Sequence, residues 1–148
     1  MEKTALVART FPNDLSQLAG LTELVSEAAD IMDVHQRCLF ELTLAVEEIF
    51  TNIVKYAFDD KAPHTIRVSM EKVGERVLVT RFEDDGKPFD PTRAAEPDLN
   101  LPVELRPVGK LGIFLVKKIM DSMTYERVEG KNVITLTKTM RPDACVLG

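Results

Sequence analysis

The sequence lacks the features that mark membrane, secreted and metal-binding proteins. No stretch approaches the ~18 consecutive apolar residues that a membrane-spanning helix needs. The first residues show no basic segment followed by an apolar run, so no signal peptide is predicted. Only two cysteines occur, Cys38 and Cys145, and their spacing fits neither a metal site nor a disulfide framework. These absences predict a protein of the reducing cytoplasm.

The sequence also has no excess of positive charge. It holds 19 Lys and Arg residues against 24 Asp and Glu residues, a formal net charge of −5. Non-specific nucleic-acid binding requires a basic surface, so neither a nucleic-acid partner nor a membrane partner is expected. No Ser-His-Asp triad, Cys-His pair or Walker A loop is present. The two histidines, His35 and His64, stand near the ends of expected elements, where surface or capping roles are predicted.

The length and composition are those of one globular domain. With 148 residues, 45% of them hydrophobic and 29% charged, the chain is long enough to bury a core. Internal repeats and low-complexity runs are absent. We therefore expect a single domain that spans residues 1–148.

Hydrophobic periodicity predicts strands and helices in a definite order. We expect strands at residues 5–11, 65–71, 76–83, 124–128 and 133–140, and helices after an Asn13 or Asp14 cap, at residues 34–58 and at residues 111–123. Residues 90–108 hold four prolines and little periodicity, which is typical of a lid or binding loop. The pattern predicts an α+β fold, a two-layer sandwich whose mixed, mainly antiparallel sheet is covered by helices on one face.

The second predicted helix carries an acid and a carboxamide four residues apart, Glu48 and Asn52. They are separated by roughly 40° around the helix, beside Glu41 and Lys55. Such a pair is usually a solvated helix face. However, Glu48 has the chemistry of a general base, and the carbonyl oxygen of Asn52 suits Mg²⁺. An asparagine that borders the core also needs a polar partner, which Mg²⁺ with phosphate oxygens would supply.

A second motif, Asp84-Asp85-Gly86, follows the strand expected at residues 76–83. Asp-Gly is favoured in hairpin turns, but no strand follows it here. A carboxylate at a strand end accepts a hydrogen bond from the exocyclic amine of adenine, and Gly86 allows the backbone to approach the ring closely. The spacing to the glycine in the D-x-G pattern favours Asp84 over Asp85.

A third motif, Gly109-Lys110-Leu111-Gly112, opens the last predicted helix. In isolation it would be a flexible loop end. It also has the composition of a phosphate site, because backbone N–H groups at a helix N-terminus attract anions. Gly109 and Gly112 keep side chains out of the way, and Lys110 adds a cationic contact.

In this order, the three motifs resemble those of the GHKL ATPases (gyrase, Hsp90, histidine kinase, MutL). Glu48 and Asn52 resemble the N-box, Asp84-x-Gly86 the G1 box and Gly109 to Gly112 the G2 box. Within that superfamily the chain resembles the anti-sigma factor serine/threonine kinases (RsbW-type, with the HATPase_c domain). The likeness is carried by residues 46–58, 83–91, 109–116 and 120–127, and covers essentially the whole chain.

The resemblance implies the GHKL (Bergerat) ATP-binding fold and a partner-switching regulator. Such a protein binds Mg-ATP, forms a homodimer, sequesters a sigma factor and phosphorylates a serine of a STAS-domain anti-anti-sigma protein. By this likeness Glu48 is the general base, Asn52 the Mg²⁺ ligand and Asp84 the adenine contact. The nucleotide-binding residues would also include Lys55, Gly86, Gly109, Lys110, Leu111 and Gly112. Many GHKL proteins have a glycine in place of Lys110, and a histidine in place of Lys55-Tyr56.

The same motifs fit two other functions. One is a non-catalytic module whose bound ATP controls partner affinity. The other is a catalytic domain that acts on a separate histidine-bearing protein, although the chain has no attached pair of dimerisation helices.

Overall fold

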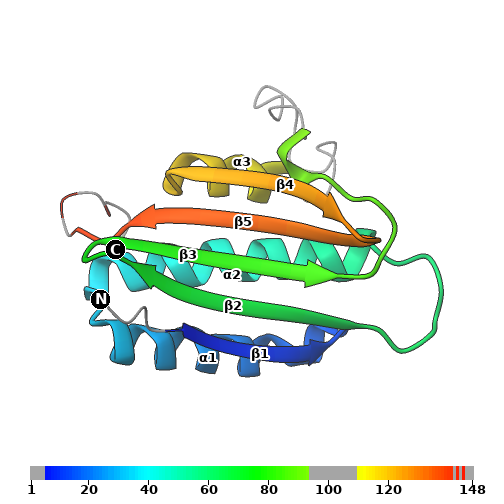
Figure 1. Cartoon of the computed structure of the whole chain (residues 1–148), viewed down its shortest axis with the longest axis horizontal. Coiled ribbons are helices and arrows are strands. Elements are labelled where there is room, and N and C mark those ends of the chain that lie inside the picture. The colour runs from blue at the N-terminus through cyan, green and yellow to red at the C-terminus, as the bar shows by residue number, and fades with distance from the viewer. Residues whose placement is uncertain (1–5, 94–109, 142, 144, 146–148) are drawn as a thin grey trace.

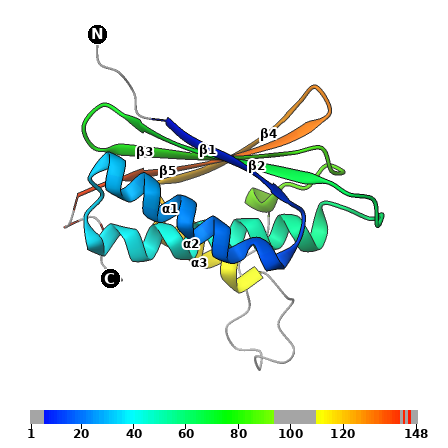
Figure 2. The same cartoon turned by 90° about the horizontal axis from the view of Figure 1, so that it is seen from below.

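The computed structural model describes residues 6–93 and 110–141, together with Asp143 and Cys145. In this part of the chain, a five-stranded sheet forms one layer and the helices pack on one of its faces (Figure 2). The strands are β1 (Leu6–Pro12), β2 (Thr65–Val73), β3 (Val77–Asp84), β4 (Ser122–Val128) and β5 (Lys131–Thr139). The helices are α1 (Leu18–Met32), α2 (Gln36–Tyr56) and α3 (Lys110–Ile119), with short 3-10 turns η1 (Leu15–Gln17) and η2 (Pro91–Arg93).

The strands lie in the order β1-β2-β3-β5-β4 (Figure 1). Every neighbouring pair among the described strands is antiparallel. The predicted two-layer α+β fold is therefore confirmed, with a sheet that is antiparallel throughout these strands rather than mixed. The two hairpins expected from the sequence, β2–β3 and β4–β5, are both present.

Strand alternation decides which side chains face the helices. Along β3 every second residue is buried, from Leu78 to Asp84. Along β5 the buried residues are Asn132, Ile134, Leu136 and Lys138. Because successive side chains of a strand point to opposite faces, a polar residue at the end of each strand, Asp84 and Asn132, faces the helical layer.

The helices bury the stripes that the periodicity predicts. On α1 the buried positions include Leu21, Val25, Ala28 and Met32. On α2 the core face consists of Leu42, Ala45, Val46, Ile49, Phe50 and Ile53, and Asn52 is buried beside it. Burial of each such large aliphatic or aromatic side chain contributes roughly 1.5–3 kcal/mol, so packing of these faces against the sheet holds the two layers together.

Several predicted element ends are wrong by a few residues. Helix α2 begins at Gln36 rather than residue 34, because the His35 side chain caps it by accepting a hydrogen bond from Arg37 N. Asp14 caps the short η1 turn rather than α1 itself. Helix α3 ends at Ile119 rather than residue 123, because Asp121 N donates to Thr137 O of β5 and draws the chain into the sheet.

A buried ion pair joins the second turn of α2 to the sheet. Glu41, expected on the polar strip beside Glu48, is 1% exposed, and its carboxylate lies 3.3 Å from Lys138 Nζ of β5. The same ammonium donates to the carbonyl oxygen of Ile119, the last residue of α3. The pair therefore ties together α2, β5 and the C-terminal end of α3.

The two cysteines correct the sequence analysis. Cys38 in the first turn of α2 forms a disulfide with Cys145, with their Cα atoms 5.0 Å apart. The residues are 107 positions apart in sequence, so spacing gave no sign of the pairing. Among the described residues, no helix combines the length and the apolar character needed to cross a bilayer.

Candidate functional site

Asp84 is a buried carboxylate with one oxygen left unpaired. It is 3% exposed at the end of β3. Its Oδ1 accepts hydrogen bonds from Gly86 N at 2.8 Å and Asn132 Nδ2 at 2.9 Å, whereas the buried Oδ2 accepts none from the described residues. Burial raises the pKa of Asp84, and the hydrogen bond from Asn132 opposes that rise. A buried hydrogen-bond acceptor without a partner lowers the stability of the fold, so Oδ2 is suited to accept a hydrogen bond from an N–H group of a ligand.

Its neighbour Asp85 has a different environment. Asp85 is exposed and lies 3.3 Å from Nδ1 of His64, whose Nε2 lies 2.6 Å from Asp60. The hydrogen bond with Asp60 raises the pKa of His64, and the imidazole stacks on Phe58 with 4.4 Å between ring centroids. His64 therefore ties the loop after α2 to the Asp84-Asp85-Gly86 turn, whereas a surface or capping role was predicted for it.

Asn132 is the site residue that sequence reasoning missed. It lies directly opposite Asp84 in the β3–β5 pairing and is fully buried. Besides its bond to Asp84, its Nδ2 donates to Lys87 O at 2.8 Å. Its Oδ1 accepts from Tyr125 Oη at 2.6 Å, Arg127 Nη1 at 3.0 Å and Phe89 N at 3.3 Å. A sequence signal existed: Asn132 shares the inward-facing parity of Ile134 and Leu136, where a polar side chain needs partners.

Gly86 is a point of close approach between the turn and the end of α2. A Cβ at this position would lie 2.3 Å from the carbonyl oxygen of Ala57, the residue that caps α2. The next residue bonds to the same atom, since Lys87 N donates to Ala57 O at 2.8 Å. In addition, Lys87 Nζ lies 2.7 Å from Asp59. The turn that carries Asp84 is thus fixed against the C-terminal end of α2.

Glu48 lies against the first turn of α3. A Cβ added to Gly112 would fall 1.9 Å from Glu48 Oε2, so the carboxylate occupies the space that the glycine leaves open. The partial positive charge of a helix N-terminus favours a carboxylate there. The structure therefore brings the first predicted motif together with the third, although Gly112 lies 64 positions after Glu48 in the sequence.

Asn52 is held by its own helix. It is 4% exposed, and its Nδ2 donates to the backbone carbonyl of Glu48 at 2.7 Å. This bond provides one of the polar partners that an asparagine bordering the core was predicted to need. It also fixes the amide orientation, so that Oδ1 is the atom with which Asn52 would meet a cation.

Of the remaining predicted site residues, Lys55 lies in the last turn of α2, and Lys110 and Leu111 begin α3. Lys55 is exposed on the last turn of α2, next to Tyr56, whose ring lies 6.0 Å from that of Phe89. Gly109 lies outside the described residues. Of Lys110 and Leu111, only the helical backbone at the start of α3 is described.

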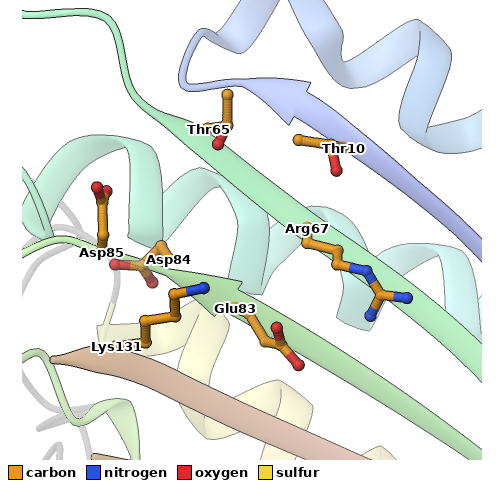
Figure 3. Close-up of a pocket in the computed structure, with 7 residues that line it drawn as sticks. All are labelled: Thr10, Thr65, Arg67, Glu83, Asp84, Asp85 and Lys131. Atoms are coloured by element: carbon orange, nitrogen blue, oxygen red, sulfur yellow. The ribbon is translucent and has the colours of Figure 1, made fainter. Parts of the chain in front are cut away.

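Two cavities lined by described residues lie near this region. One of about 240 Å³ opens on the face of the sheet away from the helices (Figure 3), and it is lined by Thr10, Thr65, Arg67, Glu83, Asp84, Asp85 and Lys131. Its charges are of both signs, which does not favour a polyanion. The other, of about 470 Å³, lies where β4 meets the segment after the turn, and its lining includes Tyr125 and Arg127 of the Asn132 network.

The three motifs converge around the C-terminal half of α2. Glu48 and Asn52 project from this helix, the turn after Asp84 packs on its last residues, and the start of α3 lies against Glu48. The site therefore holds a buried acceptor without a partner, a carboxylate, a carboxamide and a helix N-terminus close together. Groups of these kinds have the chemistry to accept a hydrogen bond from a nucleobase, to bind a cation and to attract an anion.

Comparison with known proteins defines the class. The family described as "Histidine kinase-like ATPase domain" matches residues 11–138, and the chain belongs to this family. A solved histidine kinase domain from the Erythrobacter litoralis EL346 blue-light activated histidine kinase has the same fold. Its TM-score is 0.54 at 17% sequence identity, over 88% of this chain and 64% of that one.

The curated relatives are protein kinases that act on serine or threonine, by their names. Serine/threonine-protein kinase BtrW of Bordetella bronchiseptica is 32% identical over 108 residues, which cover 73% of this chain and 75% of the relative. Serine-protein kinase RsbW of Listeria monocytogenes is 35% identical over 98 residues, 64% of this chain and 62% of the relative. RsbW of Bacillus mycoides is 25% identical over 139 residues, 90% and 85% of the two chains. The predicted resemblance to RsbW-type proteins is confirmed.

Proposed function

We propose that this protein is an ATP-dependent protein serine/threonine kinase that also acts as an anti-sigma factor. Its substrate would be a serine of a STAS-domain anti-anti-sigma protein, and its second partner a sigma factor. The observation that carries the catalytic part is the position of Glu48, which lies against the first turn of α3 and one helical turn before Asn52. The names of the relatives, all serine or serine/threonine kinases, support the same reading.

The described residues fit ATP. Asp84 Oδ2, buried and unpaired, is suited to accept the exocyclic amine of adenine. The backbone N–H groups at the start of α3, in the segment from Gly109 to Gly112, would hold the phosphates. Lys55 and the side chain of Lys110 would add positive charge. Close packing of Gly86 on Ala57 would fix the position of Asp84, the proposed adenine contact, relative to α2.

The described residues also fit a magnesium ion bound together with phosphates. Asn52 is the proposed ligand, through Oδ1, because its Nδ2 is engaged by Glu48 O. Mg²⁺ bound there supplies charge neutralisation for the phosphate oxygens, which phosphoryl transfer requires. No cluster of three His, Cys, Asp or Glu side chains suited to a metal occurs in the described part of the chain, so the phosphates would provide further ligands.

Glu48 would act as general base. The serine hydroxyl oxygen bonds to the γ-phosphorus, the bond from that phosphorus to the β,γ-bridging oxygen breaks, ADP leaves, and the hydroxyl proton passes to the Glu48 carboxylate. Its half-buried position beside a helix N-terminus orients the carboxylate.

The test replaces Glu48 by glutamine, which keeps shape and removes the base. We expect Glu48→Gln to lower phosphotransfer to a STAS-domain substrate by about 10²–10⁴-fold while ATP binding is retained. The matched control is Glu47→Gln, since Glu47 accepts a hydrogen bond from Thr22 of α1, away from α3. Transfer by Glu48→Gln at the wild-type rate would remove Glu48 from this role. Tight ATP binding without transfer in the wild type would favour the ATP-sensing module instead.

We further propose that residues 1–148 act as one histidine-kinase-like ATP-binding domain, that it works as a homodimer, and that it works in the cytoplasm, where sigma factors act. The Cys38–Cys145 disulfide is uncommon for that compartment, where thiols are kept reduced. Sedimentation of the purified protein with and without reductant tests the assembly.

A further inference from the structure

The carboxylate of Asp84 has an unequal pair of oxygens. Each carboxylate oxygen has about two lone-pair sites. Oδ1 already accepts two donors, Gly86 N and Asn132 Nδ2, whereas Oδ2 accepts none from the described residues. Asp84 therefore offers a ligand one open oxygen rather than two.

The Asn132 amide cannot reverse its orientation without losing hydrogen bonds. Its NH₂ group faces two acceptors, Asp84 Oδ1 and Lys87 O. Its carbonyl oxygen faces three donors, Tyr125 Oη, Arg127 Nη1 and Phe89 N. A flipped amide would set acceptor against acceptor or donor against donor at four of the five contacts, because only the Tyr125 hydroxyl can either donate or accept, so the network fixes an N–H donor on Asp84.

Arg127 strengthens the arrangement. The Nη1 that bonds to Asn132 also donates to Gly86 O at 2.7 Å. The second donor to Asp84 comes from the N–H of that same Gly86, so one guanidinium supports both residues that fill Oδ1. The residues come from the turn, β4 and β5, and they converge on one side of the carboxylate.

We propose that Asn132 is a positioning residue that selects adenine over guanine by keeping Oδ1 of Asp84 occupied. This rests on the proposed ATP site. Adenine presents a single kind of donor there, its exocyclic amine. The Watson–Crick edge of guanine presents two adjacent donors, N1–H and the 2-amino group, which a carboxylate takes with both oxygens. With Oδ1 filled, Asp84 satisfies the adenine donor but leaves one guanine donor buried and unpaired.

The experiment measures dissociation constants for ATP, GTP and ITP by calorimetry with Mg²⁺. Hypoxanthine in ITP has N1–H but no 2-amino group, so it carries one donor. For the wild type we expect ATP to bind best, with GTP no tighter than ITP. Asn132→Ala frees a lone pair on Oδ1, so GTP should gain about tenfold relative to both ATP and ITP, the discrimination typical of a bidentate base contact.

Two further variants keep the test decisive. Asn132→Leu keeps the branched shape of the side chain and removes the donor to Asp84, so the GTP:ATP ratio should shift in the same direction. Leu136→Val, on the same strand and buried away from the amide, serves as the control for lowered stability, and its ratio should stay at the wild-type value.

Unchanged GTP:ATP ratios in folded Asn132 variants would overturn the inference, as would an equal loss of all three nucleotides, which is what a purely structural role predicts. Failure of the wild type to bind ATP would remove the proposed function, and this inference with it. Because the wild-type ATP titration is a separate result, the two failures are distinguished.

Discussion

At the scale of single residues, the site combines a functional need with a stability cost. Asp84 is buried at the end of β3, and Oδ2 has no partner among the described residues. Burial raises its pKa, because the surroundings of low dielectric constant disfavour the charged carboxylate. The neighbouring Asn132 donor opposes this effect and keeps the carboxylate able to accept. A ligand donor at Oδ2 would relieve the cost.

The raised pKa predicts a pH dependence of stability. A carboxyl whose pKa is higher in the folded than in the unfolded state stabilises the fold at low pH, and that contribution is lost as pH rises through the folded pKa. Asp84→Asn removes the titration and keeps an acceptor for Gly86 N and Asn132. We expect the free energy of unfolding of Asp84→Asn to rise relative to that of the wild type as pH increases from about 4 to 7, and to exceed it at pH 7. Urea unfolding across this range measures the gap, and a gap independent of pH would refute the prediction.

At the scale of elements, two glycines decide how the motifs approach α2. The Cβ of an alanine at position 112 would meet only the flexible end of Glu48, whereas at position 86 it would meet the backbone of Ala57 at 2.3 Å. A side-chain end moves at little cost. A backbone contact of this kind forces the turn and the end of α2 apart.

The two alanine substitutions should therefore affect different properties, Gly112→Ala the activity and Gly86→Ala the stability. Gly112→Ala should leave the free energy of unfolding within about 1 kcal/mol of the wild type, since alanine favours helix, but it should lower phosphotransfer by displacing the Glu48 carboxylate. Gly86→Ala should lower the free energy of unfolding by about 1–3 kcal/mol. Urea unfolding and a transfer assay on both variants separate the effects. Full transfer activity in Gly112→Ala would contradict the assigned geometry.

Elements with regular hydrophobic patterns were predictable from sequence, and contacts between distant elements were not. The alternation in β3 and the stripe of α1 identified their buried faces because each pattern is local. The end of α3 was predicted too late because a bond from Asp121 to β5 competes with helix formation. Glu48, Asn52 and Asp84 were predicted as site residues from the order of the motifs. Asn132 was missed because its importance comes from partners on other strands and in the turn.

At the scale of the whole molecule, the disulfide links the first turn of α2 to the end of the chain. Cys38 and Cys145 enclose a loop with a sequence separation of 107 residues. A cross-link of this span restricts the unfolded chain strongly. The bond closes the end of the structure opposite to Asp84, where Lys138 and Glu41 also join β5 to α2.

Reduction of this bond should lower the free energy of unfolding by about 2–4 kcal/mol. Urea unfolding of the oxidised and reduced protein measures the difference, and mass spectrometry of alkylated samples verifies the thiol state. The Cys38→Ser variant, already without the bond, should show no response to reductant. Equal stability of the two forms of the wild type would show that the link does not constrain the unfolded chain.

The measurement that tests the central claim is calorimetric titration of the protein with ATP and Mg²⁺, beside Asp84→Asn and Asp85→Asn. The account predicts binding by the wild type and by Asp85→Asn, because Asp85 is exposed and paired with His64. It predicts loss of binding in Asp84→Asn, in which an amide donor would face the adenine amine. Absence of ATP binding in the wild type, or binding of equal strength in Asp84→Asn, would contradict it.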